Sequence, residues 1–552
     1  MTKYIFITGG VLSGIGKGLV TCSIGKMLQV RGFNVTAIKC DPYLNVDAGT
    51  MNPYIHGEVF VLDDGYEADM DLGAYERFLG VELTGINNVT SGQLYQQVIE
   101  RERKGGYLGR CVQIIPHITD EVKRRIRLVA EKSRADIVLV ECGGTVGDIE
   151  SLPFLEAFRQ MRQEEKRGDT LLVHVTLVPV LEAVGEPKTK PTQHSVKELR
   201  AIGLQPDIIT ARSEYGELPT AAKNKISLYC SVEERAVFTS YDVDSVYELP
   251  LVLEGQGMGD VLTEYLGLNK PTADWSEWRA MVERIKVPSD VVRIAMCGKY
   301  AELADCYVSV NEALRHSAAA SGCQISIEWI ETEEFENNPA SVKVLNDFDG
   351  VIVPGGFGKR GALGKVRAIE FCRLNDKPFL GICYGLQLSL VEISRHVLGI
   401  EDADSTECEP STSNPVIDLL PEQRSVSNMG GTMRLGSHPV MLKQDTIAHQ
   451  LYGADLICER HRHRWEVNPD YWSRLEDAGV LFSGWSTDGR RKETIELPSN
   501  YFFFATQFHP EFKSRPWSPS PPYYGLVKAS YDKKCGKPKP ELKTPIQSTK
   551  CL

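Results

Sequence analysis

Short apolar segments recur along this chain, and each ends in glycine or polar residues before a helical pattern begins. In the first half they lie at residues 4–8, 35–39, 136–141, 171–178 and 207–211. In the second half they lie at 291–298, 350–355, 377–383 and 501–508. Near-continuous runs of Val, Ile and Leu separated by helices are typical of parallel sheets covered by helices on both faces. The pattern therefore predicts an α/β fold built from doubly wound parallel sheets.

The rhythm of strands and helices breaks at about residues 268–290, where a Trp- and charge-rich segment follows Pro271. A chain of 552 residues is also too long for one hydrophobic core. We therefore expect a first domain at 1–267, a helical linker at 268–290 and a second domain at 291–533. The Lys-, Pro-, Thr- and Ser-rich residues 534–552 are expected to form a disordered tail.

The bulk composition excludes several classes of protein. A net charge of −12 argues against a general nucleic-acid or membrane-surface binder. The N-terminus lacks the features of a signal peptide, and no apolar run reaches the roughly 18 residues that cross a bilayer. The 14 cysteines are scattered without zinc or disulfide spacing, so most are expected to be buried thiols. We expect a cytoplasmic protein with no nucleic-acid or membrane partner.

A glycine-rich turn, Gly9-Gly-Val-Leu-Ser-Gly-Ile-Gly-Lys-Gly18, follows the first strand and opens a helix. Glycines let backbone N–H groups converge on a phosphate, and Lys17 adds a full charge beside the helix N-terminus. The standard phosphate loop has a different spacing, and it has a hydroxyl residue where this chain has Gly18. On this motif alone, a tight strand-to-helix turn without a ligand stays open as an alternative.

The missing hydroxyl requires carboxylates elsewhere to hold a magnesium ion. Glu141 closes an apolar strand, and ligands bind at the C-terminal ends of parallel strands. The acidic segment 63–71 offers further candidates, although its spacing alone does not select Asp71. A third element, Lys188-Thr-Lys-Pro-Thr-Gln-His-Ser195, presents a cationic surface suited to a triphosphate. An exposed loop with no ligand is the alternative there.

The segment Lys377-Pro-Phe-Leu-Gly-Ile-Cys383-Tyr-Gly385 is an apolar strand that leads into a helix. Small residues on both sides of a nucleophile permit a strained strand-to-helix turn that presents its side chain above the sheet. A helix N-terminus also favours the thiolate. Cys383 is therefore a candidate nucleophile, with a buried structural cysteine as the alternative.

Two further motifs support Cys383. His509 and Glu511, two residues apart after an apolar strand, can supply a general base and the group that orients it. The glycines of Pro354-Gly-Gly356-Phe-Gly358 can face the developing oxyanion together with the backbone amide of Tyr384. The three motifs follow one another within one predicted domain, as a Cys-His-acid hydrolase requires.

These three motifs resemble those of the triad-type (class I) glutamine amidotransferases over residues 291–530. The N-terminal half is similar to the CTP synthase family, through the Gly9–Gly18 turn, the segments 41–50, 56–61 and 141–150, and the 188–195 loop. The segments 430–436 and 459–464 match the same family. The resemblance covers residues 3 to about 533, and it implies a P-loop-like amidoligase domain followed by an amidotransferase domain.

The resemblance implies a ligase of pyrimidine nucleotide biosynthesis. ATP phosphorylates the 4-oxygen of UTP, and ammonia from L-glutamine then displaces the phosphate to give CTP. The implied catalytic triad is Cys383, His509 and Glu511. The implied ATP-binding residues are Gly14, Ile15, Gly16, Lys17, Gly18, Leu19, Lys39 and Asp71, and the implied ligands of Mg²⁺ are Asp71 and Glu141.

Further positions match the family's substrate sites. Those for UTP and CTP are Ser13, Asp148, Ile149, Glu150, Lys188, Thr189, Lys190, Pro191, Thr192, Gln193 and Lys225. Those for glutamine are Gly356, Tyr384, Gly385, Leu386, Gln387, Glu407 and Arg464. Pro53, His56 and Val59 match the mouth of an ammonia tunnel.

The resemblance also implies regulation and assembly. GTP is the expected allosteric activator, with Arg360 as its contact, CTP is a feedback inhibitor, and residues 430–436 form a lid. A homotetramer is expected, and filaments are known in the family. Cys40, Cys142, Met70 and Tyr384 depart from common family residues, but we expect none of these changes to remove a functional group.

Two rival functions remain at this stage. The same pair of domains occurs in amidoligases that act on a carboxylate of a cobalamin precursor, but the 188–193 lysine loop and the Asp148-Ile-Glu150 segment favour a nucleotide substrate. A catalytically idle scaffold or filament former is the other rival. Every catalytic group is present in the sequence, which counts against that interpretation.

Overall fold

The computed structural model describes residues 2–180, 185–214, 216–269, 272–286, 290–299, 304–424, 431–540 and 542. The chain forms two compact units. The first contains Met1–Ala48 and Asp71–Val282, and the second contains Gly49–Met70 and Glu283–Leu552. Residues 49–70 therefore group with the second unit, although they lie inside the predicted first domain. No strand or helix pattern in the sequence indicates that residues 49–70 group with the second unit.

The first unit is built on a seven-stranded sheet with strand order β5-β2-β6-β1-β7-β8-β9. All of its strand pairs are parallel, as the apolar segments predict. The strands are β1 (Lys3–Gly9), β2 (Val35–Asp41), β5 (Asn88–Thr90), β6 (Ile137–Cys142), β7 (Thr170–Leu177), β8 (Ile208–Ser213) and β9 (Val237–Tyr241).

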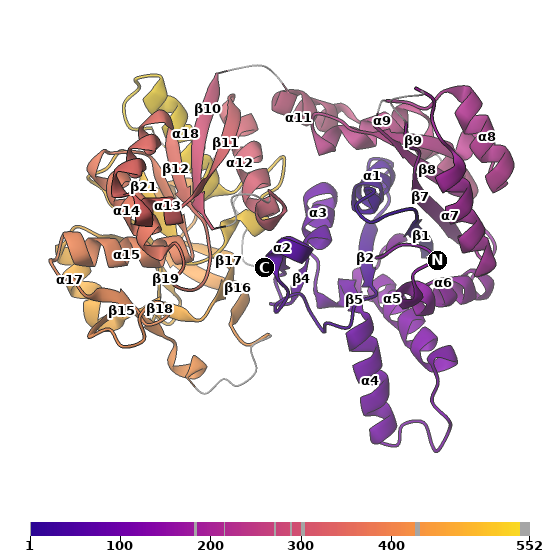
Figure 1. The fold of residues 1–552 in the computed structure, drawn as a ribbon, viewed down its shortest axis with the longest axis horizontal. Coiled ribbons are helices and arrows are strands. Elements are labelled where there is room, and N and C mark those ends of the chain that lie inside the picture. The colour runs from indigo at the N-terminus through magenta and orange to yellow at the C-terminus, as the bar shows by residue number, and fades with distance from the viewer. Residues whose placement is uncertain are drawn as a thin grey trace. The chain divides into compact units, whose positions relative to one another are not determined.

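Helices cover both faces of this sheet (Figure 1). The helices are α1 (Lys17–Gln29), α3 (Met70–Leu79), α4 (Ser91–Arg103), α5 (Thr119–Ser133), α6 (Leu152–Glu164), α7 (Lys190–Ala201), α8 (Thr220–Cys230), α9 (Leu249–Gly255), α10 (Met258–Tyr265) and α11 (Ser276–Lys286). Val138 and Val140 share a buried cluster with residues of α4 to α7. Leu139 points to the opposite face because strand side chains alternate, and it lies 3.0 Å from where a Cβ on Gly25 of α1 would be. The sheet is therefore doubly wound.

The second unit contains a nine-stranded sheet with order β11-β10-β12-β13-β21-β20-β19-β16-β17. The pairs from β11 to β21 are parallel and those from β21 to β17 are antiparallel. Its strands are β10 (Val291–Gly298), β11 (Gln324–Glu331), β12 (Gly350–Val353), β13 (Phe379–Ile382), β16 (Arg434–Leu442), β17 (Leu456–His463), β19 (Leu481–Ser486), β20 (Lys492–Glu496) and β21 (Phe503–Thr506). Strands β10, β12, β13 and β21 of the parallel half correspond to the predicted apolar segments, whereas β11 was not predicted.

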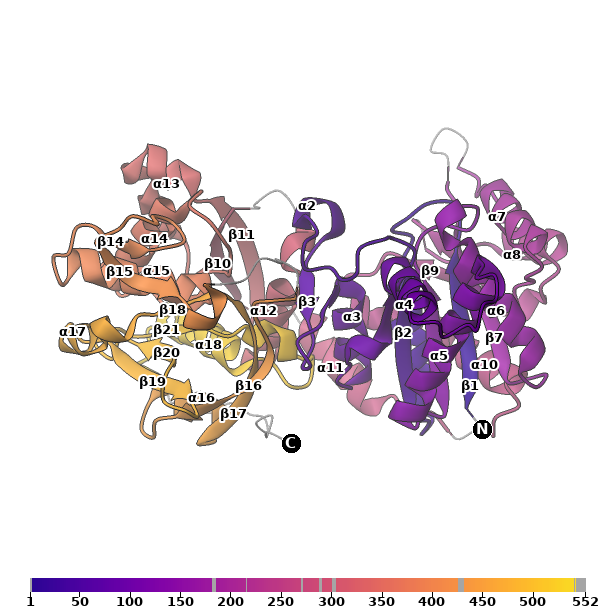
Figure 2. The same ribbon diagram turned by 90° about the horizontal axis from the view of Figure 1, so that it is seen from below.

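Buried residues divide the helices of this unit between the two faces of the sheet (Figure 2). Residues of α14 and α15 pack with Val351 and Phe379, whereas α12 and α18 pack with Ile352 and Leu380, the next residues along each strand. The helices are α12 (Val308–Ser321), α13 (Glu333–Asn337), α14 (Ala362–Leu374), α15 (Tyr384–His396), α16 (Ile447–Tyr452), α17 (Trp472–Asp477) and α18 (Pro521–Lys534).

Smaller elements complete the second unit. A three-stranded sheet consists of β14 (Ala403–Ser405), β15 (Asn414–Leu419) and β18 (Trp465–Val467). Residues 49–70 form α2 (Pro53–His56) and the hairpin of β3 (Val59–Val61) and β4 (Glu67–Asp69). Arg460 and Arg462 of β17 bind this hairpin segment through Asp63 and Glu67, which fixes it to the second unit.

The predicted disordered tail is only partly described. The hydroxyl of Tyr501 donates to the carbonyl oxygens of Lys537 and Pro538, so these residues pack against the second unit. Residues 541 and 543–552 lie outside the described part of the chain.

Candidate functional site

Cys383 lies between β13 and α15, on a sharp turn with a φ angle of 52°. A Cβ on Gly381 would lie 2.9 Å from the backbone of Gly385, and a Cβ on Gly385 would lie 2.3 Å from the carbonyl oxygen of Val353. Glycine at these two positions is therefore required by close backbone approach. The turn presents Cys383 at the carboxyl ends of the parallel strands, where ligands bind in such sheets.

His509 follows β21, which pairs with β13, the strand that ends just before Cys383. Its Nδ1 atom lies 2.8 Å from Oε1 of Glu511, and the hydroxyl of Tyr523 donates to Oε2 of the same carboxylate. Its Nε2 atom is buried, and the imidazole interacts with Cys383 as well as with Glu511. The ring is thus held by Glu511 at one nitrogen and keeps the other for proton transfer.

The groups around His509 favour the protonated form of its imidazole. Burial lowers the pKa of His509, but Glu511 and Cys383 together outweigh it and raise this pKa to about 10. These two neighbours therefore favour the imidazolium form of His509. A cation beside a cysteine at a helix N-terminus stabilises the thiolate.

One cavity in the second unit, of about 470 Å³, brings most of the predicted glutaminase residues together. Cys383, His509 and Glu511 line it, and Gly356, Glu407 and Arg464 do so as well. Pro53 and Val59 from the 49–70 segment also line this cavity. His56 lies on α2 with an exposed side chain and is not among the described lining residues.

Backbone geometry explains the glycine turn that follows β12. A Cβ on Gly355 would come within 2.7 Å of Cε1 of His509, so a larger residue would displace the imidazole. The amide of Gly358 donates to Glu407, 2.7 Å from Oε1, and burial raises the pKa of Glu407 to about 7. The turn and this carboxylate are therefore held together at the wall of the cavity.

The hydrogen bonds and burial of Arg464, Leu386 and Gln387, three of the predicted glutamine-binding residues, differ from one another. Arg464 donates to Gln423 and Thr432, and it reaches the cavity. Leu386 is fully buried among apolar residues, and Gln387 donates to the carbonyl oxygen of Trp465 at 2.9 Å. Neither residue is among the described lining residues of the cavity, although Gln387 contacts Trp465, which lines it.

The structure adds functional residues that sequence reasoning missed. Gln507 is buried, and its Nε2 atom lies 3.6 Å from Sγ of Cys383. Its Oε1 atom accepts from Gln387 at 3.3 Å. Lys299 and Trp465 line the same cavity. Gln507 lies two residues before His509 in the sequence. This closeness to the predicted base was the one sequence feature that could have indicated Gln507 as a site residue.

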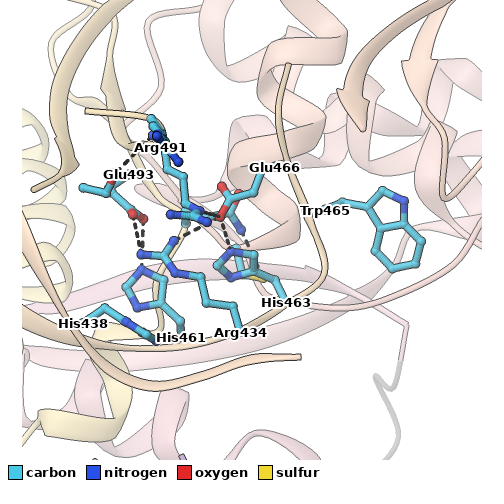
Figure 3. A network of polar contacts seen from close by, with 12 residues as sticks. Arg434, His438, His461, His463, Trp465, Glu466, Arg491 and Glu493 are labelled. Carbon is cyan, nitrogen blue, oxygen red and sulfur yellow. Dashed lines mark hydrogen bonds and ion pairs between the residues drawn. The ribbon is translucent and has the colours of Figure 1, made fainter. Parts of the chain in front are cut away.

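A buried polar network lies on β16, β17, β18 and β20 (Figure 3). Arg434 binds Glu466 at 3.0 Å and Glu493 at 2.7 Å. His461 lies 2.9 Å from Glu493, and the backbone carbonyl of Glu493 accepts from the amide of Gln507. Of the predicted lid, residues 431–436 are described. Arg434, near the end of this segment, thereby connects the lid to β20, whose residue Glu493 binds the backbone of Gln507.

In the first unit, the glycine-rich turn joins β1 to α1 and ends at Gly16, with a φ angle of 91°. Lys17 crosses back over this turn. Its Nζ atom donates to the carbonyl oxygen of Gly144 at 2.7 Å, and a Cβ on Gly9 would lie 2.5 Å from its side chain. The turn therefore places Lys17 and the N-terminus of α1 at the carboxyl ends of the strands.

The two predicted metal-binding carboxylates converge in the same region. Asp71 and Glu141 both bind the ammonium of Lys39, which lies 3.1 Å from Oε1 of Glu141. Thr21 and Tyr75 donate to the other oxygen of Glu141. Two carboxylates that share one cation provide the hard oxygen donors that Mg²⁺ prefers, so these residues fit the predicted metal.

A second cavity, of about 370 Å³, adjoins the glycine-rich turn and was not predicted. Ile15, Gly16 and Leu19 form one side of it. The other side comes from residues at the ends of β8 and β9 and beyond: Arg212, Ser240, Tyr241, Asp242, Val243, Val246 and Leu249. Arg212 donates to the carbonyl oxygen of Gly14 and pairs with Asp242 at 2.9 Å.

The predicted UTP and CTP residues are mostly exposed. Ser13, Asp148, Ile149, Glu150, Lys190 and Lys225 have exposed side chains. Thr189 and Thr192 are buried at the start of α7, where Thr192 bonds Thr176 at 2.6 Å. Lys188 pairs with Glu186 at 2.9 Å. The loop is thus anchored by its threonines and presents its lysines outward.

Comparisons with known proteins agree on one family. Residues 3–268 match the model of the CTP synthase N-terminus, and residues 302–529 match that of class I glutamine amidotransferases. The CTP synthase of Thermococcus kodakarensis is 57% identical over 97% of this chain and 100% of its own length. The chain belongs to the CTP synthase family.

A second CTP synthase supports this assignment, and a solved structure is also similar to the chain. The CTP synthase of Archaeoglobus fulgidus is 54% identical over 96% of this chain and 98% of its own length. The solved structure of a Trypanosoma brucei CTPS glutaminase domain with bound acivicin is 36% identical, covers 47% of this chain and 100% of that domain, and has a TM-score of 0.43. The predicted family and α/β fold are confirmed, and the cobalamin-precursor alternative is excluded. Among the described residues, no helix has the length and apolar character to span a membrane.

Proposed function

We propose that this chain makes CTP from UTP, ATP and L-glutamine by dividing the chemistry between two sites. The observation that carries the proposal is the cavity shared by Cys383, His509 and the 49–70 segment. A cavity that contains a nucleophile, its acid–base partner and the predicted tunnel residues Pro53 and Val59 suits the release of a small nucleophile. His56 is assigned to the same tunnel on the family resemblance alone.

In the glutaminase step, the Cys383 thiolate attacks the side-chain amide carbon of glutamine. The backbone amides of Gly356 and Tyr384 donate hydrogen bonds to the oxyanion. The imidazolium of His509 gives its proton to the departing ammonia. Water then hydrolyses the thioester to glutamate. Glu407 is suited to the α-ammonium group and Arg464 to the α-carboxylate, while Gly385, Leu386 and Gln387 hold the wall in place.

In the synthetase step, the loop Gly14, Ile15, Gly16, Lys17, Gly18 and Leu19 binds the phosphates of ATP, with Lys17 and Lys39 supplying positive charge. The unpredicted cavity beside Gly16 is suited to the adenosine part, because apolar residues and Asp242 line it. Asp71 and Glu141 would hold Mg²⁺, which neutralises phosphate charge during transfer to the UTP 4-oxygen. Ammonia is mostly protonated in water at neutral pH, so an enclosed source favours attack on the phosphorylated pyrimidine.

The remaining assignments rest on the resemblance. UTP and the feedback inhibitor CTP would be bound by Ser13, by Asp148 to Glu150, by Lys188 to Gln193 and by Lys225. We propose GTP as an activator that contacts Arg360, a homotetramer, and a cytoplasmic location. If the lysine loop binds the triphosphate, Lys188→Ala should raise the KM for UTP and leave the KM for glutamine unchanged.

The two-site proposal is tested with Cys383→Ala. We expect no CTP from glutamine and a normal rate from added ammonia, with UTP and ATP present in both assays. The matched control is Cys323→Ala, a buried cysteine of the same unit that does not line the cavity in the described structure. Loss of synthesis from ammonia in a folded Cys383→Ala protein would contradict the division of labour.

A further inference from the structure

Lys365 lies near the start of α14, and its side chain is completely buried. Its Nζ atom has no hydrogen-bond partner among the residues that the structure describes. Burial of an ammonium without a paired carboxylate is strongly unfavourable, and lysine is almost never fully buried without a partner. The position of this cation therefore requires a physical explanation.

Two parts of the glutaminase site surround the Lys365 ammonium. Nζ lies 5.1 Å from the centre of the Tyr384 ring, and a Cβ on Gly356 would be 3.3 Å from it. The hydroxyl of Tyr384 donates to the carbonyl oxygen of Gly358 at 2.9 Å. Gly356 lines the cavity that contains Cys383, whereas Lys365 is not among its described lining residues. Lys365 thus lies behind the glycine turn, close to Gly356 and to the side-chain ring of Tyr384, the residue whose amide is the other proposed oxyanion donor.

Other ionisable groups face this ammonium from neighbouring elements. Glu331 of β11 stabilises its charged form and Lys299 opposes it. The thiols of Cys297 of β10 and Cys408 also face it, and burial raises the pKa of both thiols. Lys299 donates to the carbonyl oxygens of Phe357 and Gly358.

One further group, Glu407, affects the balance of charge around Lys365. Lys365 in turn stabilises the ionised form of Glu407, which accepts from Gly358. Burial, with Lys299 as a smaller cause, lowers the pKa of Lys365 to about 7. The turn is therefore surrounded by two ammonium groups and one partly neutralised carboxylate.

We propose that Lys365 is a positioning residue that supports the oxyanion of glutamine hydrolysis from behind the glycine turn, acting through the Gly356 and Tyr384 backbone and not through contact with glutamine. The inference rests on the proposed role of Cys383. The amide oxygen of bound glutamine is neutral, and it becomes an anion only when the thiolate attacks. A fixed buried cation near its hydrogen-bond donors stabilises that anion without binding the ground state more tightly.

The first test replaces Lys365 with methionine, which has a similar length and no charge. We expect Lys365→Met to lower kcat for glutamine hydrolysis about tenfold, less than the loss of a direct oxyanion donor, and to leave KM for glutamine nearly unchanged. Lys359→Met is the matched control, because that lysine belongs to the same turn but has a side chain 72% exposed. Solvent screens an exposed charge, so the control should keep its normal kcat.

The second test uses pH. In the unmodified chain, the Lys365 ammonium loses its proton as pH rises through about 7, so kcat should contain a descending component in that region. Lys365→Arg keeps its charge, so it should restore the rate and lose this component. Lys365→Met should be slow and should lack the same component. A merely structural role would not move the pH profile in this way.

The outcomes separate this inference from the proposed function. A Lys365→Met protein that makes CTP from ammonia and hydrolyses glutamine at the normal kcat would refute the role of Lys365. An equal change in kcat and KM, or an unaltered profile in Lys365→Arg, would refute it as well. If Lys365→Met does not fold, the Lys365→Arg profile alone decides. Glutamine hydrolysis by Cys383→Ala would instead refute the proposed nucleophile.

Discussion

The carboxylate of Asp71 occupies the space into which a side chain at Gly18 would project. A Cβ on Gly18 would lie 2.6 Å from Oδ1 of Asp71. The standard phosphate loop has a serine or threonine at this point, and its hydroxyl binds magnesium. In this chain a carboxylate from α3 takes that position, and Gly18 is needed to leave room for it.

Restoring the hydroxyl residue of the standard loop should therefore damage the site. We expect Gly18→Ser to push Asp71 away from Lys39 and Glu141 and to lower CTP synthesis from ammonia by at least about a hundredfold. Glutamine hydrolysis, measured in the same preparation, should persist and serves as the control for folding. A Gly18→Ser protein with normal synthesis from ammonia would show that Asp71 is not needed at this position.

The pair of His509 and Glu511 leads to a prediction about pH. The carboxylate of Glu511 helps to raise the pKa of His509 to about 10, so the imidazolium is lost only as pH rises through that value. Glu511→Gln removes this charge and should move the basic limb of the glutaminase profile to lower pH. The measurement is kcat for glutamine hydrolysis between pH 6 and pH 10. An unmoved basic limb would mean that another group sets it.

Most of the parallel strands could be predicted because they are buried on both faces and read as continuous apolar runs; β5, β9 and β11 were not predicted. β1 and β6 illustrate this, since every residue of β6 is buried. β17 escaped prediction for the opposite reason. Its sequence Glu459-Arg-His-Arg-His463 reads as an exposed charged loop, yet all but Arg462 are buried, because the partners come from distant strands.

The candidate sites show the same limit. Cys383, His509 and the glycine turn carry local motifs, so the sequence was sufficient to find them. Gln507 and the cavity beside Gly16 depend on residues that only the sheet brings together. Lys365 lies in a helix with no local motif around it, and its burial behind Gly356 is visible only in the folded chain.

The buried network around Arg434 should make a large contribution to stability. Arg434→Met would leave Glu466 and Glu493 without this cation, and Glu493 is completely buried. Removing one partner of a buried ion pair costs about 3–5 kcal/mol. We expect the second unit to unfold at a lower urea midpoint, which tryptophan fluorescence would measure.

The control for this variant is Arg424→Met, because Arg424 pairs with Asp418 in the same unit but its side chain is 64% exposed. Exposed pairs contribute about 0–1 kcal/mol, so its midpoint should stay within error of the unmodified chain. Equal midpoints for both variants would mean that the buried network does not stabilise the unit.

The turn at Cys383 gives a last prediction, which separates backbone geometry from the chemistry of the thiol. Gly385→Ala keeps the thiol and its neighbours, but its methyl group would collide with the carbonyl oxygen of Val353. We expect glutaminase activity to fall at least about a hundredfold while CTP synthesis from ammonia persists, because a displacement of about 1 Å in a nucleophile can cost that much. Gly255→Ala is the matched control, since no atom lies within 4 Å of its added methyl group and its φ is not positive. Normal glutamine hydrolysis by Gly385→Ala would show that the turn can relax, and that the close approach of residue 385 to β12 does not position the thiolate.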